Sequence, residues 1–281
     1  MRELNDTYRP SIIWNDICYP PATDLRELFA YYYNAIPDGV INDRWAQQSA
    51  INKLYKDLIV KPNPVSRFIA NAIADLVVKF ASESVVTPKW PKKFHCDYIT
   101  PEYVSLKTSV PYKWEATRGI GNSFGYNQFE TAEHYASIDS LIRMLVDIVS
   151  KNGNLLLNVG PSADGSIPDL QKERLLGLGA WLAINGEAIF GTRPWGCAEG
   201  KTECGVDIRF TEKGDILYAH LLERPKQREI AVRSLAISSN AKIQLLGAKN
   251  DLEWRNTGKG VSITLPAKFD AAAVYVIKIM N

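Results

Sequence analysis

Short apolar runs that end in polar residues alternate with amphipathic helices over the first part of this 281-residue chain. The run Ser11–Trp14 has the length and β-branching of a buried strand. A helix is predicted next, with Thr23 and Asp24 as cap candidates and an apolar stripe over 25–32, and the run Val40–Ile41 predicts a second strand. Strand, helix and strand in this order are typical of a parallel sheet or barrel, where chemistry gathers at the strand ends.

The alternation returns later in the chain and then gives way to another pattern. A helix is predicted over 138–151, a buried strand over 154–158 and a third helix from about 168 to 184. From about Pro194, short alternating runs separated by Gly, Asn and Pro predict an antiparallel β-sandwich with a structural role. The predicted strands are 207–210, 216–222, 230–232, 243–246, 261–265 and 274–277.

The segment from about 46 to 93 has a different composition, rich in Lys and interrupted by Pro. One amphipathic helix is predicted inside it, with its apolar side over 68–80. We interpret it as an insertion packed on the α/β region. Binding to a membrane surface is a weaker alternative, because the apolar stripe is short and the polar face is only modestly basic.

Charge and composition exclude several classes of function. The chain has 33 Lys and Arg against 31 Asp and Glu, without a basic run interleaved with aromatic residues, so nucleic acid is not an expected partner. It shows no stretch of signal-peptide type and no apolar run of membrane-spanning length, so we expect a cytoplasmic protein without a membrane partner. The four cysteines lack CxxC spacing and are expected to be free thiols, and the pair His95–Cys96 has no second pair for a metal.

Four charged residues stand where chemistry is expected. Asp16 ends the first predicted strand beside Trp14, and it is either a nucleophile or a carboxylate that caps the following loop. Arg44, near the end of the second strand, either binds a hydroxyl-rich ligand or pairs with its neighbour in sequence. Glu102 and Glu115 both lie in aromatic surroundings, and on this pattern either could be a general acid.

Several longer motifs run through the chain: Trp14–Asp16, Leu28–Asn34, Asn42–Trp45, Tyr112–Tyr126, Asn154–Pro161 and Asp164–Pro168. In order, spacing and length, these motifs resemble those of the α-L-fucosidases of glycoside hydrolase family 29. The resemblance covers nearly the whole chain. In fold, the resemblance implies that residues 1–193 form the later part of a (β/α)8-like barrel, with an insertion at about 46–93, and that residues 194–281 form the β-sandwich.

The resemblance also implies the roles of the catalytic residues. Asp16 matches the family nucleophile, and Glu102 matches the acid/base in members similar to this chain, with Glu115 as the alternative. Hydrolysis then proceeds by double displacement with retention of configuration, and needs neither a metal nor an organic cofactor.

Contacts to the sugar are implied in the same way. Trp14, Arg44 and Phe124 match family positions that bind fucose, and Phe124 is expected to face the apolar C5 methyl side. The expected substrate is a terminal α-L-fucose on a glycan.

Compared with the family, the first part of the barrel and its fucose-binding histidines are expected to be missing from this chain. Its three histidines, at 95, 134 and 220, do not replace that constellation. We therefore expect a complementary N-terminal fragment or self-association, as a homo-oligomer, to cover the open sheet edge. The alternative is an inactive remnant that acts as a sugar-binding or structural protein.

Overall fold

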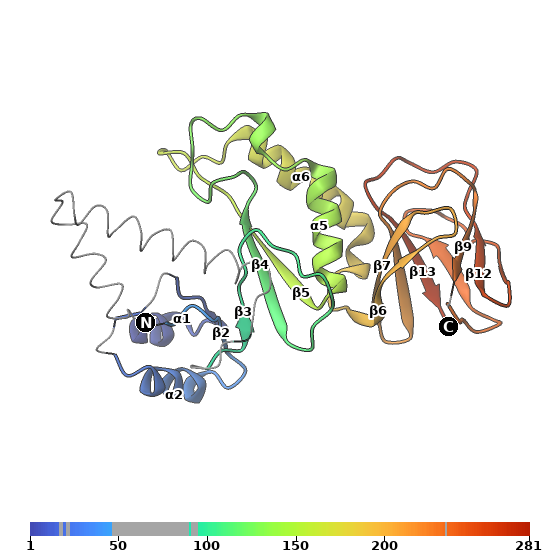
Figure 1. Ribbon diagram of the computed structural model, residues 1–281. Helices are drawn as coiled ribbons and strands as arrows, with labels where there is room; N and C mark the ends of the chain where they lie inside the picture. Colours follow the sequence, from blue (N-terminus) through green and yellow to red (C-terminus); the bar gives the residue numbers. More distant parts are fainter. Residues whose placement is uncertain (17–18, 21–22, 47–89, 91–94, 234) are drawn as a thin grey trace, which may run out of the picture. The chain divides into compact units, whose positions relative to one another are not determined.

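The computed structural model describes residues 1–16, 19–20, 23–46, 90, 95–233 and 235–281 (Figure 1). The predicted insertion at about 46–93 and the helix expected inside it lie almost entirely outside the described residues. The chain divides into two compact units. The first unit contains Met1–Val104 with Lys113–Glu115, and the second contains Ser105–Tyr112 with Ala116–Asn281.

The first unit carries short parallel strands, as the α/β pattern predicts. β1 pairs with β2 in parallel, and β3 pairs in parallel with the first residues of β4. Its elements are α1 (Arg2–Tyr8), β1 (Ile12–Ile13), α2 (Leu25–Ala35), β2 (Val40–Ile41), β3 (Tyr98–Ile99) and the start of β4 (Lys113–Gly119). The strands predicted around 12 and 40 are confirmed, whereas β3 and β4 were not predicted.

Of the two cap candidates at the start of α2, the structure selects Asp24. The Asp24 side chain accepts hydrogen bonds from the backbone N–H groups of Arg26 and Glu27, which would otherwise lack partners in the first helical turn. The buried face of the helix packs on residues of β1 and β2 and on Trp45. This packing fixes β1 and β2, and the predicted nucleophile and arginine follow these two strands in the sequence.

Asp97 joins β2 to the segment that leads into β3, although the two are far apart in sequence. Its backbone N–H donates to the Ile41 carbonyl at 3.0 Å, and its Oδ2 accepts from the Ile41 N–H at 2.7 Å and from the Tyr33 hydroxyl at 2.6 Å. The residues that follow β3 are therefore held beside the end of β2.

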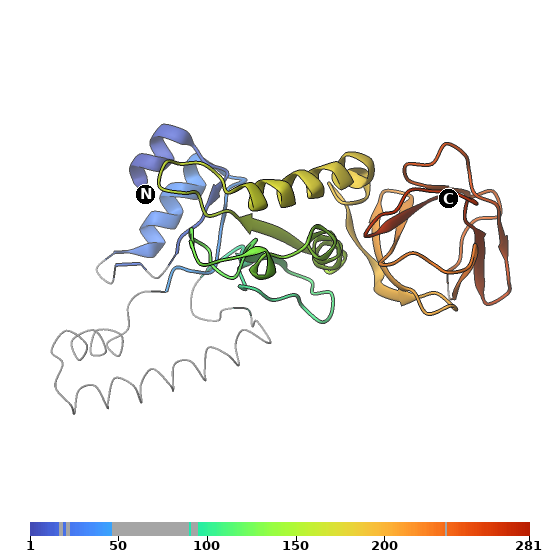
Figure 2. The same cartoon turned by 90° about the horizontal axis from the view of Figure 1, so that it is seen from above.

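The second unit combines two helices with two antiparallel sheets. It contains the rest of β4, η1 (Ala132–His134), α5 (Ile138–Ser150), β5 (Gly153–Asn158), α6 (Asp169–Asn185) and η2 (Gly186–Ala188). Figure 2 views α5 nearly end on with α6 beside it. Both helices bury apolar side chains against Tyr218 and Val274 of the antiparallel sheets that follow, which span β6 to β13 and are called the β-domain below. The Trp181 indole N–H donates to the Val274 carbonyl at 3.0 Å. The predicted helices and the strand between them are confirmed.

The antiparallel sheets enclose one apolar core between them. Their orders are β10-β13-β8-β7-β6 and β11-β12-β9. The strands are β6 (Arg193–Lys201), β7 (Asp207–Lys213), β8 (Ile216–Leu221), β9 (Glu229–Arg233), β10 (Lys242–Leu245), β11 (Trp254–Asn256), β12 (Gly260–Thr264) and β13 (Tyr275–Met280). Only β6 and β11 are absent from the predicted runs; neither strand contains a buried residue, so neither shows a regular apolar alternation.

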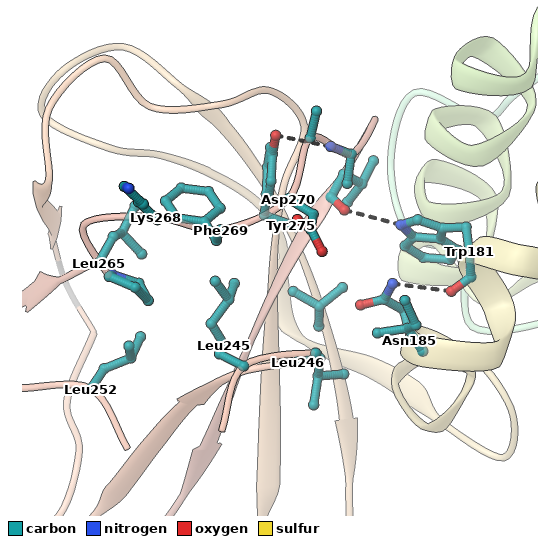
Figure 3. Close-up of a pocket in the computed structure, with 18 of the residues that line it drawn as sticks. Trp181, Asn185, Leu245, Leu246, Leu252, Leu265, Lys268, Phe269, Asp270 and Tyr275 are labelled. Carbon is teal, nitrogen blue, oxygen red and sulfur yellow. Dashed lines mark hydrogen bonds between the residues drawn. The ribbon is translucent and has the colours of Figure 1, made fainter. Parts of the chain in front are cut away.

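A cavity of about 930 Å³ lies between α6 and the loops of the β-domain (Figure 3). Its lining includes Trp181, Asn185, Leu246 and Phe269. None of the predicted site residues lines it. Among the described residues, no helix is both long and apolar enough to cross a membrane.

A charged network ties α5 to the β-domain. Asp147 on α5 accepts hydrogen bonds from Lys151 at 2.9 Å, from Arg209 on β7 at 2.6 Å and from the Ser105 hydroxyl. Burial alone would raise the pKa of Asp147, but these hydrogen bonds together lower it below its ordinary value. The Lys151 side chain is only 5% exposed, so Asp147 and Glu199 are needed to stabilise its positive charge.

Asp147→Ala should lower the free energy of unfolding by about 3 kcal/mol, because it leaves Lys151 and Arg209 with one carboxylate fewer. Urea unfolding followed by circular dichroism measures the change. Asp139→Ala is the matched control, since Asp139 lies on the same helix, is exposed, and pairs with Arg143 only at 3.9 Å. Equal, small losses in the two variants would contradict the assigned role of Asp147.

Candidate active site

Arg44 lies at the centre of a group of polar side chains in the first unit. Its Nη1 contacts both Asp16 Oδ1, at 3.2 Å, and Glu102 Oε1. Its Nε donates to the Thr100 hydroxyl at 2.8 Å and its Nη2 donates to the Thr100 carbonyl at 2.9 Å. The guanidinium is thereby fixed in position, and one of its nitrogen atoms joins the two predicted catalytic carboxylates.

Two buried asparagines hold the ends of β1 and β2 together. The Asn15 N–H donates to Asn42 Oδ1 at 3.1 Å, and Asn42 Nδ2 donates back to the Asn15 carbonyl at 2.8 Å. Asn15 Nδ2 also donates to the Arg44 carbonyl at 2.8 Å. Asp16 and Arg44 each lie within two residues of this pair, so it places them side by side. Neither asparagine carries a role that the sequence predicts.

Asp43 links the end of β2 to the end of β3. Its Oδ1 accepts from the Thr100 N–H at 3.0 Å and from the Thr100 hydroxyl at 2.6 Å. The suggested alternative, in which Arg44 simply pairs with Asp43, is therefore not what the structure shows. Glu102 follows two residues after Thr100, and Tyr103 then adopts a left-handed backbone with φ 52°, a conformation unfavourable for a bulky residue and often found at functional sites.

Trp14 and Glu115 form a second layer of contacts behind the arginine. The Trp14 indole N–H donates to Glu115 Oε1 at 2.8 Å. The guanidinium carbon of Arg44 lies 4.8 Å from the centroid of the Trp14 ring, which is a cation–π contact. Burial raises the pKa of Glu115, and the hydrogen bond from Trp14 and the charge of Arg44 only partly oppose this shift.

The shared contact with Arg44 limits the separation of the two carboxylates. Asp16 Oδ1 and Glu102 Oε1 both lie within hydrogen-bonding distance of one nitrogen atom, so these oxygens are at most about 6 Å apart. Retaining glycosidases have carboxyl groups about 5–5.5 Å apart, whereas inverting enzymes need about 6.5–9.5 Å to admit a water molecule. The geometry is suited to attack by a carboxylate. The two side chains are also accessible, at 54% exposed for Asp16 and 41% for Glu102.

Phe124 belongs to the second unit, where two of the sequence motifs meet. Asn158 Nδ2 donates to the Phe124 carbonyl, and the Ile120 N–H donates to the Asn158 carbonyl at 3.1 Å. A Cβ atom at Gly160 would lie 2.5 Å from the Tyr126 nitrogen, so only glycine allows this approach. The contact of Phe124 with the sugar stays a prediction.

The histidines make contacts within their own units. His95 contacts the Tyr33 hydroxyl at 3.0 Å, and His134 accepts from the Thr131 N–H at 3.0 Å. His220 is fully buried, contacts Thr211, and has its pKa lowered to about 3 by burial. In the part of the chain that the structure describes, no three His, Cys, Asp or Glu side chains are grouped as metal ligands, and the three cysteines there are free thiols.

Comparisons with known proteins agree over both parts of the chain. The family model for α-L-fucosidase matches residues 1–187, and the model for the α-L-fucosidase C-terminal domain matches residues 201–280. Human tissue α-L-fucosidase is 30% identical over 273 residues, which are 94% of this chain and 49% of that protein.

Solved structures give the same result. An α-fucosidase of Thermotoga maritima in complex with a mechanism-based inhibitor is 38% identical, with a TM-score of 0.76, over 100% of this chain and 55% of that chain. The Thermotoga maritima α-fucosidase in complex with fucose is also 38% identical, with a TM-score of 0.73, over 99% of this chain and 54% of that chain.

The chain spans about half the length of these relatives. The matched region has the architecture described above, a mixed α/β part with parallel strands followed by antiparallel sheets. Members of glycoside hydrolase family 29 are retaining hydrolases. With a family model over its α/β part and a second over its β-domain, this chain belongs to the α-L-fucosidases of glycoside hydrolase family 29.

Proposed function

We propose that this chain carries the catalytic carboxylates of a retaining α-L-fucosidase that removes terminal α-L-fucose from glycans. The observation that carries the proposal is the shared contact of Asp16 and Glu102 with Arg44 Nη1, which keeps the two contacting oxygens within about 6 Å, below the range of inverting enzymes. The fucose bound in the Thermotoga maritima relative supports fucose as the sugar.

In the proposed reaction, Asp16 is the nucleophile and Glu102 is the acid/base. A carboxylate oxygen of Asp16 bonds to the anomeric carbon while the bond to the leaving oxygen breaks, and Glu102 gives its proton to that oxygen. Glu102 then takes a proton from water, and the resulting hydroxide displaces Asp16 to release fucose with its original configuration. The leaving group departs as an alcohol in the first step, and at the end of the cycle Glu102 is protonated again and Asp16 is a free carboxylate.

The contacts favour Glu102 over Glu115 as the acid/base. Glu102 shares Arg44 with the nucleophile and is accessible, whereas the Glu115 carboxylate accepts the hydrogen bond of the Trp14 indole. One observation favours Glu115, namely its raised pKa, since a general acid must hold its proton near neutral pH. We weigh the shared contact more heavily because a general acid must first reach the leaving oxygen.

We also propose that activity depends on the part of the relatives that this chain does not span. Each unit exposes large apolar side chains. In the first unit, Ile12 of β1 is 49% exposed, and in the second unit, Leu176 and Ile184 of α6 are exposed. These side chains provide apolar surface that a further segment would cover, which supports the proposal. The second candidate function, an inactive sugar-binding or structural protein, is supported by the same half-length coverage.

Asp16→Ala should reduce fucoside hydrolysis by about 10⁴-fold in the active assembly, since no other group replaces the nucleophile. Azide should partly restore turnover and yield a fucosyl azide of inverted configuration, which NMR identifies. Asp38→Ala, in an exposed turn, is the control and should show neither effect. Near-normal turnover of Asp16→Ala would overturn the assignment of the nucleophile.

Substrates that differ in leaving group separate the two glutamates. Glu102→Ala should slow fucosides with poor leaving groups by about 10²- to 10⁴-fold and slow activated aryl fucosides far less, because only the former need protonation in the first step. Glu115→Ala should slow both classes alike. The reverse pattern would transfer the acid/base role to Glu115.

Hydrolysis of a chromogenic α-L-fucoside tests the dependence on a complementary segment. The chain alone should show little or no turnover, and turnover should rise sharply when a segment carrying the remaining length of the relatives is co-expressed. Full turnover by the chain alone would contradict the dependence, and no turnover in either case would favour the inactive alternative.

A further inference from the structure

The Trp14 side chain connects Glu115 to the arginine of the candidate site. Its indole N–H donates to Glu115 Oε1 at 2.8 Å, and its ring face lies against the Arg44 guanidinium at 4.8 Å. Arg44 in turn contacts Asp16 and Glu102. A continuous set of contacts therefore runs from Glu115 to both predicted catalytic carboxylates, entirely within the first unit.

The two ends of this connection come from distant parts of the sequence. Trp14 directly follows β1, whereas Glu115 is the third residue of β4 and lies 101 residues further along the chain. Both side chains are partly buried. A partly buried carboxylate that loses its hydrogen-bond donor remains poorly solvated, which is unfavourable. Both side chains are therefore more stable when the hydrogen bond between Trp14 and Glu115 is kept.

We infer that Glu115 is a positioning residue, which holds the Trp14 indole so that its ring supports Arg44 between Asp16 and Glu102. The inference rests on the proposed function. Glu115 acts here as a hydrogen-bond acceptor, and it transfers no proton to the substrate or to water. Without it, the indole is free to turn, and the arginine loses the surface that fixes its orientation.

Glutamine distinguishes this role from acid/base catalysis. The side chain of Glu115→Gln keeps an oxygen that accepts the indole N–H but has no titratable proton. Glu115→Leu removes the acceptor at similar size. A positioning role therefore requires that Glu115→Gln keeps the activity that Glu115→Leu loses. An acid/base role requires that both substitutions lose activity.

The first measurement is steady-state kinetics in the assembly that hydrolyses fucosides. Glu115→Leu should lower kcat by about 10- to 100-fold for good and poor leaving groups alike, without removing a limb of the pH profile. Glu115→Gln should recover most of that kcat. Trp14→Phe, which keeps a ring but loses the N–H, should add little further loss when combined with Glu115→Leu, because both substitutions break the same contact.

The second measurement needs no turnover. In the chain labelled with ¹⁵N-tryptophan, the Trp14 indole resonance is assigned by its disappearance in Trp14→Phe. Glu115→Leu should shift this resonance upfield and speed its hydrogen exchange, whereas Glu115→Gln should leave it protected.

The outcomes separate the inference from the proposed function. The positioning role would be overturned if the indole resonance did not change in Glu115→Leu. It would also be overturned if the Leu and Gln variants lost kcat equally and in a way that depends on the leaving group. Wild-type turnover would remain in both cases. Absence of turnover in the wild-type assembly would instead overturn the proposed function, and the inference with it.

Discussion

The contacts of the Arg44 guanidinium are the interaction on which the candidate site depends. One cation contacts two carboxylates and both the hydroxyl and the carbonyl of Thr100, and its face lies on an indole ring. Arginine suits this position because its planar group donates in several fixed directions and also stacks on aromatic rings. A lysine offers a single charged point and could not make the same set of contacts.

The strand ends supply the precision that the arginine needs. Asn15 and Asn42 join the ends of β1 and β2, Asp43 joins β2 to the residue after β3, and Asp97 fixes the approach to β3. Each link is a side chain that bonds to the backbone of a neighbouring strand. Very short strands have few ladder hydrogen bonds of their own, so these side chains take over the alignment. Asp16 and Glu102 meet because the strands that precede them are tied together.

The sequence predicts much of the fold because local signals specify it. The cap at Asp24 and the apolar stripe after it define α2, and the apolar alternation defines most strands of the β-domain. The strands β6 and β11 escape prediction because none of their residues is buried, so no apolar alternation marks them. At the site, Asp16, Arg44 and Glu102 could be picked out from strand ends and motifs. The contacts of Asn15, Asn42 and Glu115 could not, because they join residues 27 and 101 positions apart.

Covalent trapping of the intermediate tests the central claim, that Asp16 is the nucleophile at a retaining site. The active assembly is treated with 2-fluoro-fucosyl fluoride and is then digested for mass spectrometry. We expect one added 2-fluoro-fucosyl group, carried by the peptide that contains Asp16 and located on that carboxylate. Inactivation with the label on Glu102, Glu115 or any other residue would contradict the account.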